Sequence, residues 1–201
     1  MTFNRGASLI TALTLLLASL GMANAGGSHM HTGGRTTQPV GHYEFCQGLP
    51  QECRQKTPKR GPVELSRKLW ATIIAVNNDV NTSVMPLTDM EIWGREEVWS
   101  YPVNGEGDCE DYVLEKRRRL MQAGVPAGNL LITVVRQPNG EGHAVLTVHT
   151  SMGDFILDNL EGKVLPWSET PYTYLKRQSV QHSGVWVSIS DGRADAVASV
   201  R

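Results

Sequence analysis

One cysteine of the sequence stands where a catalytic nucleophile would be placed. Cys109 follows Gly105 and Gly107, and it lies at the start of a segment, 108–122, in which apolar residues recur at helical spacing. The N-terminus of a helix carries partial positive charge, which stabilises the thiolate that attacks a carbonyl carbon. The glycines allow a substrate backbone to approach the sulfur closely. The alternative, a small buried hydrophobic residue, fits poorly with three acidic residues within two positions of the cysteine.

A cysteine nucleophile also needs a base, and a group that orients the base. His143 and Asp158 lie on either side of a turn at residues 151–153, beside runs rich in β-branched and aliphatic residues. If His149 pairs with Met152, His143 faces Asp158 across two antiparallel strands, with Cβ atoms about 5 Å apart. A slip of one residue would turn the two side chains to opposite faces. The alternative is a histidine that merely ends a strand.

The cysteine count predicts one disulfide and one free thiol. The chain has three cysteines, so an oxidising compartment leaves one of them unpaired. Cys46 and Cys53 are close together in a segment rich in Gly, Pro and Gln that reads as a loop, and we expect them to be bonded to each other. Cys109 is then the free thiol, and catalysis is the leading explanation for keeping it free.

The acidic residues beside Cys109 have two interpretations. Asp108, Glu110 and Asp111 offer carboxylate oxygens of the kind that Ca²⁺ prefers, but acids at a helix N-terminus also act as caps. Acids near a thiol raise its pKa, so their charge should be balanced, either by a cation or by the basic run at 116–119. The basic run is otherwise a solvated helix face, and we assign it no nucleic-acid role.

Two groups are candidates for stabilising an oxyanion. Trp99 lies ten residues before Cys109; it either lines a cleft, with its indole N–H available, or packs in the core. The backbone N–H of Cys109 is the stronger candidate, because N–H groups in the first turn of a helix have no intrahelical partner.

The ends of the chain indicate export. Residues 1–25 have the three parts of a secretory signal: a positive charge, an apolar run at 9–20 and a small-x-small cleavage site. We expect a flexible lead at 26–40 and a frayed tail at 191–201. The apolar run is shorter than the about 20 residues that a membrane-spanning helix needs. We therefore expect no membrane span and a periplasmic or secreted protein.

The charge balance restricts the partners. The chain carries 19 basic and 20 acidic residues, and removal of the signal takes away one arginine and no acid, which leaves a net charge of −2. A near-neutral protein has no electrostatic surface for nucleic acid or anionic lipid. We expect a protein or peptide substrate.

The elements expected around these residues form one α+β domain over residues 41–190. Apolar residues recur at steps of three and four from 63 to 80, which predicts an amphipathic helix. Residues 81–107 lack clear periodicity and are expected to form a long ordered loop with at most short helices. A helix at 108–122 is then followed by an antiparallel sheet. The predicted strands are 130–135, 143–148, 154–157 and 185–189.

Three sequence blocks resemble a known family: 107–112 (GDCEDY), 142–146 (GHAVL) and 157–160 (LDNL). They are similar to those of the bacterial transglutaminase-like cysteine proteinases, many of which are periplasmic. The resemblance implies a papain/transglutaminase-like fold, with N-terminal helices and the nucleophile at a helix start packed on an antiparallel sheet. It also implies that Cys109 is the nucleophile, His143 the base and Asp158 its orienter.

The resemblance also bears on calcium. Family members that process biofilm adhesins need Ca²⁺ held by acids that flank the cysteine, and Asp108, Glu110 and Asp111 match those positions. This chain differs from that subgroup in its cysteine-containing N-terminal block and in residues 103–106. Calcium is the one cofactor that the sequence suggests.

We expect hydrolysis of a peptide bond through an acyl-enzyme on Cys109, with His143 as base and Asp158 as its orienter. One alternative is transfer of the acyl group to an amine by the same triad, as in a transglutaminase or amidase, which a site that excludes water would favour. The other is an inactive module that only binds a partner in the cleft. The intact triad argues against the second alternative.

Overall fold

The computed structural model describes residues 29–57 and 61–190, together with Met1. The expected signal at 1–25, the first residues of the lead and the tail at 191–201 lie outside the described residues. The helices are α1 Val40–Gly48, α2 Pro50–Cys53, α3 Arg67–Ser83, α4 Asp89–Trp93 and α5 Cys109–Gln122, with short 3-10 turns η1 Ala127–Asn129 and η2 Trp167–Glu169. The strands are β1 Thr32–Thr36, β2 Met85–Pro86, β3 Glu106–Gly107, β4 Leu130–Arg136, β5 Gly142–Thr150, β6 Gly153–Leu157, β7 Leu165–Pro166, β8 Thr173–Ser179 and β9 His182–Ile189.

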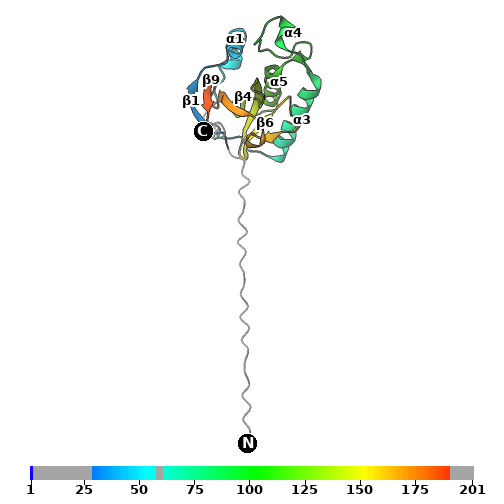
Figure 1. Cartoon of the computed structure of the whole chain (residues 1–201). Helices are drawn as coiled ribbons and strands as arrows, with labels where there is room; N and C mark the ends of the chain where they lie inside the picture. Colours follow the sequence, from blue (N-terminus) through cyan, green and yellow to red (C-terminus); the bar gives the residue numbers. More distant parts are fainter. Residues whose placement is uncertain (2–28, 58–60, 191–201) are drawn as a thin grey trace, which may run out of the picture.

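Seven strands form one antiparallel sheet in the order β1-β9-β8-β4-β5-β6-β7. Helix α5 packs against β4 and β5, and α3 packs against α5 (Figure 1). Strands β2 and β3 form a separate parallel pair within the loop that precedes α5. The predicted α+β class is confirmed. Among the described helices, none is long and apolar enough to cross a membrane.

The two long helices form where the sequence predicts them. Helix α3 begins at Arg67 because the Ser66 hydroxyl accepts a hydrogen bond from the Leu69 N–H at 3.1 Å, which caps the first turn. Residues 63–66 of the predicted helix therefore remain outside it. Helix α5 covers 109–122, as predicted, and its buried side faces the sheet.

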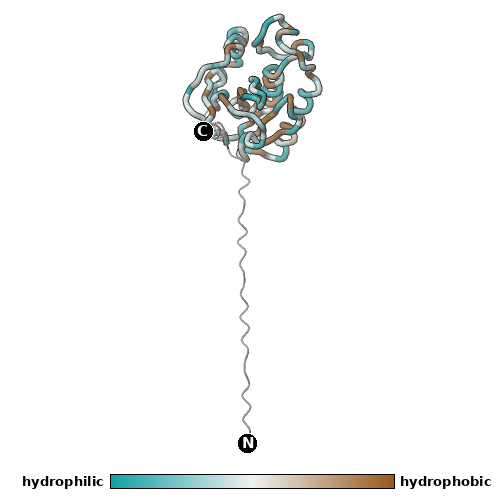
Figure 2. Tube along the Cα trace, viewed as in Figure 1, coloured by the Kyte–Doolittle hydropathy of each residue, from teal (hydrophilic) through white to brown (hydrophobic). Residues whose placement is uncertain are grey.

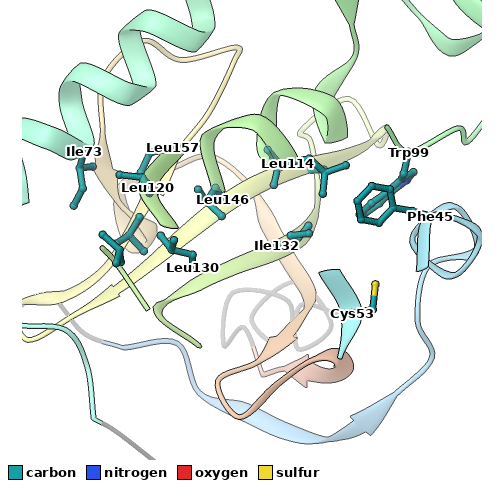
Figure 3. Close-up of a cluster of buried hydrophobic side chains, with 14 of the residues drawn as sticks. Phe45, Cys53, Ile73, Trp99, Leu114, Leu120, Leu130, Ile132, Leu146 and Leu157 are labelled. Carbon is teal, nitrogen blue, oxygen red and sulfur yellow. The ribbon is translucent and has the colours of Figure 1, made fainter. Parts of the chain in front are cut away.

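The core lies between α5 and the sheet, and it fixes the position of α5. Hydrophobic residues gather in the central strands (Figure 2), and their side chains meet those of the helices (Figure 3). Full burial of one leucine contributes about 1.5–3 kcal/mol. Six core residues that hold α5 on β4, β5 and β6 are Leu114, Leu120, Leu130, Ile132, Leu146 and Leu157.

The predicted flexible lead does not hold for residues 29–40. Strand β1 pairs with β9, Met30 is buried, and the Met30 N–H donates to Asp154 Oδ2 at 2.8 Å. All five β1 residues are exposed, so no alternation of apolar residues marks the strand in the sequence. Backbone hydrogen bonds to β9 supply the order that the side chains do not indicate.

Cys46 and Cys53 form the predicted disulfide, with Cα atoms 5.6 Å apart. The segment that contains them is helical, however, because Cys46 lies in α1 and Cys53 ends α2. Pro50 starts α2 at the first helical position, where a missing N–H costs nothing. The expected loop is thus only a short break between two helices.

The β5–β6 register differs from the one assumed in the sequence. His149 pairs with Asp154 rather than with Met152, and Thr150 pairs with Gly153, whose φ is +118°. Hydrogen bonds from the Thr150 hydroxyl to the Gly153 carbonyl and from the Met152 N–H to that hydroxyl set the turn. The difference is two residues, so His143 and the residue after β6 still lie on the same face of the sheet.

Candidate active site

Cys109 is the first residue of α5, and the structure leaves it as the free cysteine among the described residues. Its thiol donates to Glu110 Oε2 at 3.0 Å, and its sulfur accepts from the backbone N–H of Ala144 on β5. Burial raises the pKa of the Cys109 thiol well above its usual value, and the charges of Glu110 and Asp108 act in the same direction. The helix N-terminus and the Ala144 N–H favour the thiolate.

His143 and Asp158 are both buried and lie side by side. His143 Nε2 is 2.9 Å from Asp158 Oδ1, which leaves Nδ1 as the ring nitrogen available to another partner. Asp158 follows the end of β6, diagonally across from His143 on β5, so the contact survives the difference in register.

Three further groups hold Asp158. The Tyr172 hydroxyl donates to Oδ2 at 2.5 Å, and the Leu160 N–H donates to Oδ1 at 3.0 Å. The Asn81 amide, from α3, donates to the Asp158 carbonyl at 2.8 Å. Burial alone raises the pKa of Asp158, but the hydrogen bonds and the charge of His143 outweigh it, so the pKa lies below its usual value. Asp158 is therefore held as a carboxylate.

Cys109 and His143 line the same cleft, whose volume is about 510 Å³. Trp99 is 7% exposed: it lines the cleft and also packs against His42 and Trp186, so both interpretations of this residue are partly right. Its position depends on Gly41, because a Cβ there would lie 2.3 Å from the Trp99 ring. The other lining residues are Pro39, Val40, Glu97, Glu110, Val134, Gly142, Ala144 and Lys176.

A cluster of three aspartates lies beside the start of α5. One carboxylate oxygen each from Asp89, Asp108 and Asp111 lies within 4.8 Å of the others. Asp89 Oδ1, Asp108 Oδ1 and Asp111 Oδ2 are buried and make no hydrogen bond within the described part of the chain. The partner oxygens of Asp89 and Asp111 accept backbone N–H groups, from Val98 at 2.6 Å and from Ser100 at 2.8 Å.

The electrostatics of this cluster fit a bound cation. Burial and the neighbouring acids raise the pKa of Asp108 to about 8, and burial raises the pKa of Asp111 to about 7. A hard cation with oxygen ligands would satisfy the unbonded oxygens and offset the repulsion. Gly107 permits the arrangement, because a Cβ there would lie 2.7 Å from the Asp111 carboxylate.

The structure divides the acids that the sequence grouped together. Asp108 and Asp111 join Asp89, whereas Glu110 faces the thiol of Cys109 and belongs to a second group with Asp108. Asp89 lies 19 residues before Asp108, at the start of the short helix α4, and no spacing in the sequence connects the two. Tyr172 and Asn81, which donate hydrogen bonds to Asp158, were not predicted from the sequence either, because no spacing connects them to Asp158.

Comparisons with known proteins confirm the predicted family and its transglutaminase-like fold. The family model for bacterial transglutaminase-like cysteine proteinases (BTLCP) matches residues 32–194. Among solved structures, LapG of Legionella pneumophila is 24% identical, with a TM-score of 0.51 over 80% of this chain and 88% of that chain. The EGTA-treated LapG is 25% identical, with a TM-score of 0.51 over 80% and 89%, and the calcium-bound LapG is 25% identical, with a TM-score of 0.48 over 77% and 96%. A comparison with curated proteins gives no match. Because the family model covers well over half of the sequence, this chain belongs to the bacterial transglutaminase-like cysteine proteinases and is a cysteine peptidase of transglutaminase-like type.

Proposed function

We propose that this protein is an exported peptidase that cleaves a peptide bond of a protein substrate through an acyl-enzyme on Cys109. His143 takes the thiol proton as Cys109 Sγ attacks the carbonyl carbon, and it then gives a proton to the leaving amine. Water hydrolyses the thioester and restores the thiol. Asp158 holds the imidazole in the required orientation and stabilises the imidazolium.

The observation that carries the proposal is the buried 2.9 Å contact between His143 Nε2 and Asp158 Oδ1, in a cleft that also contains Cys109. An ionised Asp158 accepts a hydrogen bond from Nε2–H, so Nδ1 is left without a proton and can accept the one from the thiol. The position of Cys109 at the start of α5 is the placement that favours a thiolate.

The start of α5 also supplies oxyanion donors. Asp108 stands at the N-cap position but makes no side-chain hydrogen bond to the helix, so the first N–H groups of α5 are not capped by it. We assign the backbone N–H of Cys109 to the oxyanion, with the Trp99 indole as a second donor. Both groups lie beside the cleft.

We infer that Asp89, Asp108 and Asp111 hold Ca²⁺ beside the active site. The support is the set of three buried carboxylate oxygens without a hydrogen-bond partner. Bound calcium would offset the negative charge that raises the pKa of the Cys109 thiol. The 1–25 segment and the disulfide between Cys46 and Cys53 support a periplasmic or secreted location.

The test is the rate of Cys109 alkylation by iodoacetamide as a function of pH, on the mature protein and on its His143→Ala variant, followed by intact mass. A thiolate that reacts below about pH 7 and depends on His143 supports the Cys–His pair. Ordinary thiol behaviour near about pH 8.5 in both proteins contradicts it and favours a binding module. Casein digested with and without an added primary amine separates hydrolysis from acyl transfer, since only transfer adds the mass of the amine to the product.

A further inference from the structure

A second group of metal-ligating side chains lies on the sheet. One ring nitrogen each from His29 and His149 and one carboxylate oxygen of Asp154 lie within 4.8 Å of one another. His149 is in β5, Asp154 is in β6, and His29 comes shortly before β1. His149 lies six residues beyond His143 on β5, about 20 Å along the strand, so the group is separate from the active site.

The two histidines have the contacts that metal-binding histidines have. His149 Nδ1 is 2.6 Å from Asp154 Oδ1, and the two imidazole rings lie edge to face with their centroids 4.7 Å apart. His29 Nε2 is 2.9 Å from the carbonyl oxygen of Thr150, which leaves Nδ1 of that ring for another partner. A histidine that binds a metal ion almost always gives its second ring nitrogen to a carboxylate or a backbone carbonyl.

Asp154 is held so that one oxygen points to the histidines. Its Oδ2 accepts hydrogen bonds from the Met30 N–H at 2.8 Å and from Arg177 Nη1 at 2.9 Å. Its Oδ1 contacts His149, and the Asp154 side chain is 0% exposed. A carboxylate that binds a metal ion is itself fixed by hydrogen bonds of this kind.

The ligand types indicate which ion the group would bind. Two imidazoles and one carboxylate suit Zn²⁺ and the neighbouring transition metals, whereas Ca²⁺ takes oxygen ligands. A tetrahedral zinc ion with bonds of about 2.0–2.2 Å holds its ligand atoms about 3.3 Å apart. Because these atoms lie within 4.8 Å of one another, shifts of about 1.5 Å or less would close the site.

We propose that His29, His149 and Asp154 bind a divalent transition-metal ion of the Zn²⁺ class. The ion takes the place of the proton between His149 Nδ1 and Asp154 Oδ1, because a neutral imidazole can carry its proton on Nε2 instead. His29 supplies the third ligand. The ion joins the segment before β1 to the β5–β6 hairpin, and this role does not depend on the proposed peptidase activity.

The affinity should be moderate. Arg177 shares the carboxylate of Asp154, and its positive charge opposes that of the ion. We therefore expect a dissociation constant for zinc in the micromolar range. The bound ion should also raise Tm, because it binds the folded chain, in which the three ligands are together.

The experiment is isothermal titration of zinc chloride into the mature protein with Cys109→Ala, in the presence of excess calcium. The substitution removes a thiol that would itself bind zinc, and calcium occupies the aspartate cluster beside α5. We expect one zinc ion per chain. His29→Gln and His149→Gln, made in the same background, should each weaken zinc binding by at least about tenfold, since each removes one ligand.

The matched control is His182→Gln. His182 lies in β9 and is in none of the metal-ligating groups found within residues 29–57 and 61–190, so this variant should bind zinc as the parent does. The Tm of each variant without zinc shows whether it folds. Zinc should raise the Tm of the parent and of His182→Gln, but not that of His29→Gln, whose side chain lies outside the strands.

Three outcomes overturn the proposal. The parent binds no zinc, or His29→Gln binds zinc as tightly as the parent, or added calcium displaces zinc competitively, which would place the zinc in the aspartate cluster. None of these outcomes affects the proposed function, because the titration does not measure peptide cleavage or the reactivity of Cys109.

Discussion

His42 should make the stability of the fold depend on pH. It is 1% exposed, and its ring lies between those of Trp99 and Trp186, with centroids 5.3 and 5.2 Å away. The Trp186 indole N–H donates to Nδ1 at 3.3 Å, and the Gln178 amide nitrogen lies 3.3 Å from Nε2. An imidazolium carries a proton on both nitrogens, so it would face a donor at each of them. Burial, together with the charge of Arg117, lowers the pKa of His42 to about 4.

The lowered pKa of His42 determines whether stability rises or falls with pH. Between about pH 6.5 and about pH 4 the unfolded chain binds a proton at His42 that the folded protein does not, so stability falls as the pH falls through this range. A difference of about 2.5 pKa units corresponds to about 3 kcal/mol in the free energy of unfolding. This contribution is present in full above about pH 6.5 and absent below about pH 4. For a domain of this size the loss equals roughly 6–12 °C in Tm.

Urea unfolding at about pH 7 and about pH 4, with a chelator present and the disulfide intact, measures this loss. The His42→Gln variant keeps an acceptor for Trp186 but cannot be charged. Between these two pH values its free energy of unfolding should fall by about 3 kcal/mol less than that of the unaltered protein, whatever its stability at neutral pH. His31→Gln makes the same change at an exposed histidine and should keep the unaltered dependence. Equal losses in His42→Gln and the unaltered protein would refute the reasoning.

Three other predictions test the site and its supports. Tyr172→Phe removes the 2.5 Å hydrogen bond to Asp158 and should slow the alkylation of Cys109 several-fold. It should also lower the free energy of unfolding in urea by about 1–3 kcal/mol. An unchanged alkylation rate would show that Asp158 does not need this hydrogen bond. Asp89→Asn should abolish the rise in Tm that calcium gives the unaltered protein. In the presence of a chelator this variant should have a higher Tm than the unaltered protein, because one buried acid is neutralised. If calcium still raised the Tm of the variant by the full amount, Asp89 would not be a calcium ligand. Replacement of Cys46 and Cys53 by serine removes a disulfide between residues seven apart in the sequence and should lower the free energy of unfolding by about 2–3 kcal/mol. The variant should have a lower urea midpoint, and a reductant should no longer change that midpoint. A variant as stable as the oxidised protein would contradict this prediction.

The sequence predicts the elements that have a one-sided apolar pattern, and it misses those that do not. Helix α5 and strands β4, β5 and β6 have clear patterns and form close to the predicted residues. Strand β8, in the middle of the sheet, was not predicted because it buries Arg177 and Gln178. The partners of these side chains are far away in the sequence: Arg177 donates to Asp154, 23 residues away, and Gln178 accepts from the Ile132 N–H, 46 residues away.

The same limit applies to the acids. Carboxylates next to Cys109 in the sequence are visible as a group, but the cluster that the fold assembles exchanges Glu110 for Asp89. The loop at 81–107 brings Asp89 to the start of α5 through the pairing of β2 with β3 and the hydrogen bond from the Val98 N–H. A ligand supplied by a loop without periodicity can be found only after the loop has been folded.

The pair of His143 and Asp158 shows which errors a sequence-based register can tolerate. Side chains alternate between the faces of a strand, so an error of one residue places an expected pair on opposite faces, whereas an error of two leaves both on the same face and shifts them along it. The assumed pairing was wrong by two, and the long imidazole and carboxylate side chains span the diagonal that results. What the sequence identified reliably was therefore the shared face, and the contact itself was fixed by Tyr172, Leu160 and Asn81, which hold Asp158 beyond the end of β6.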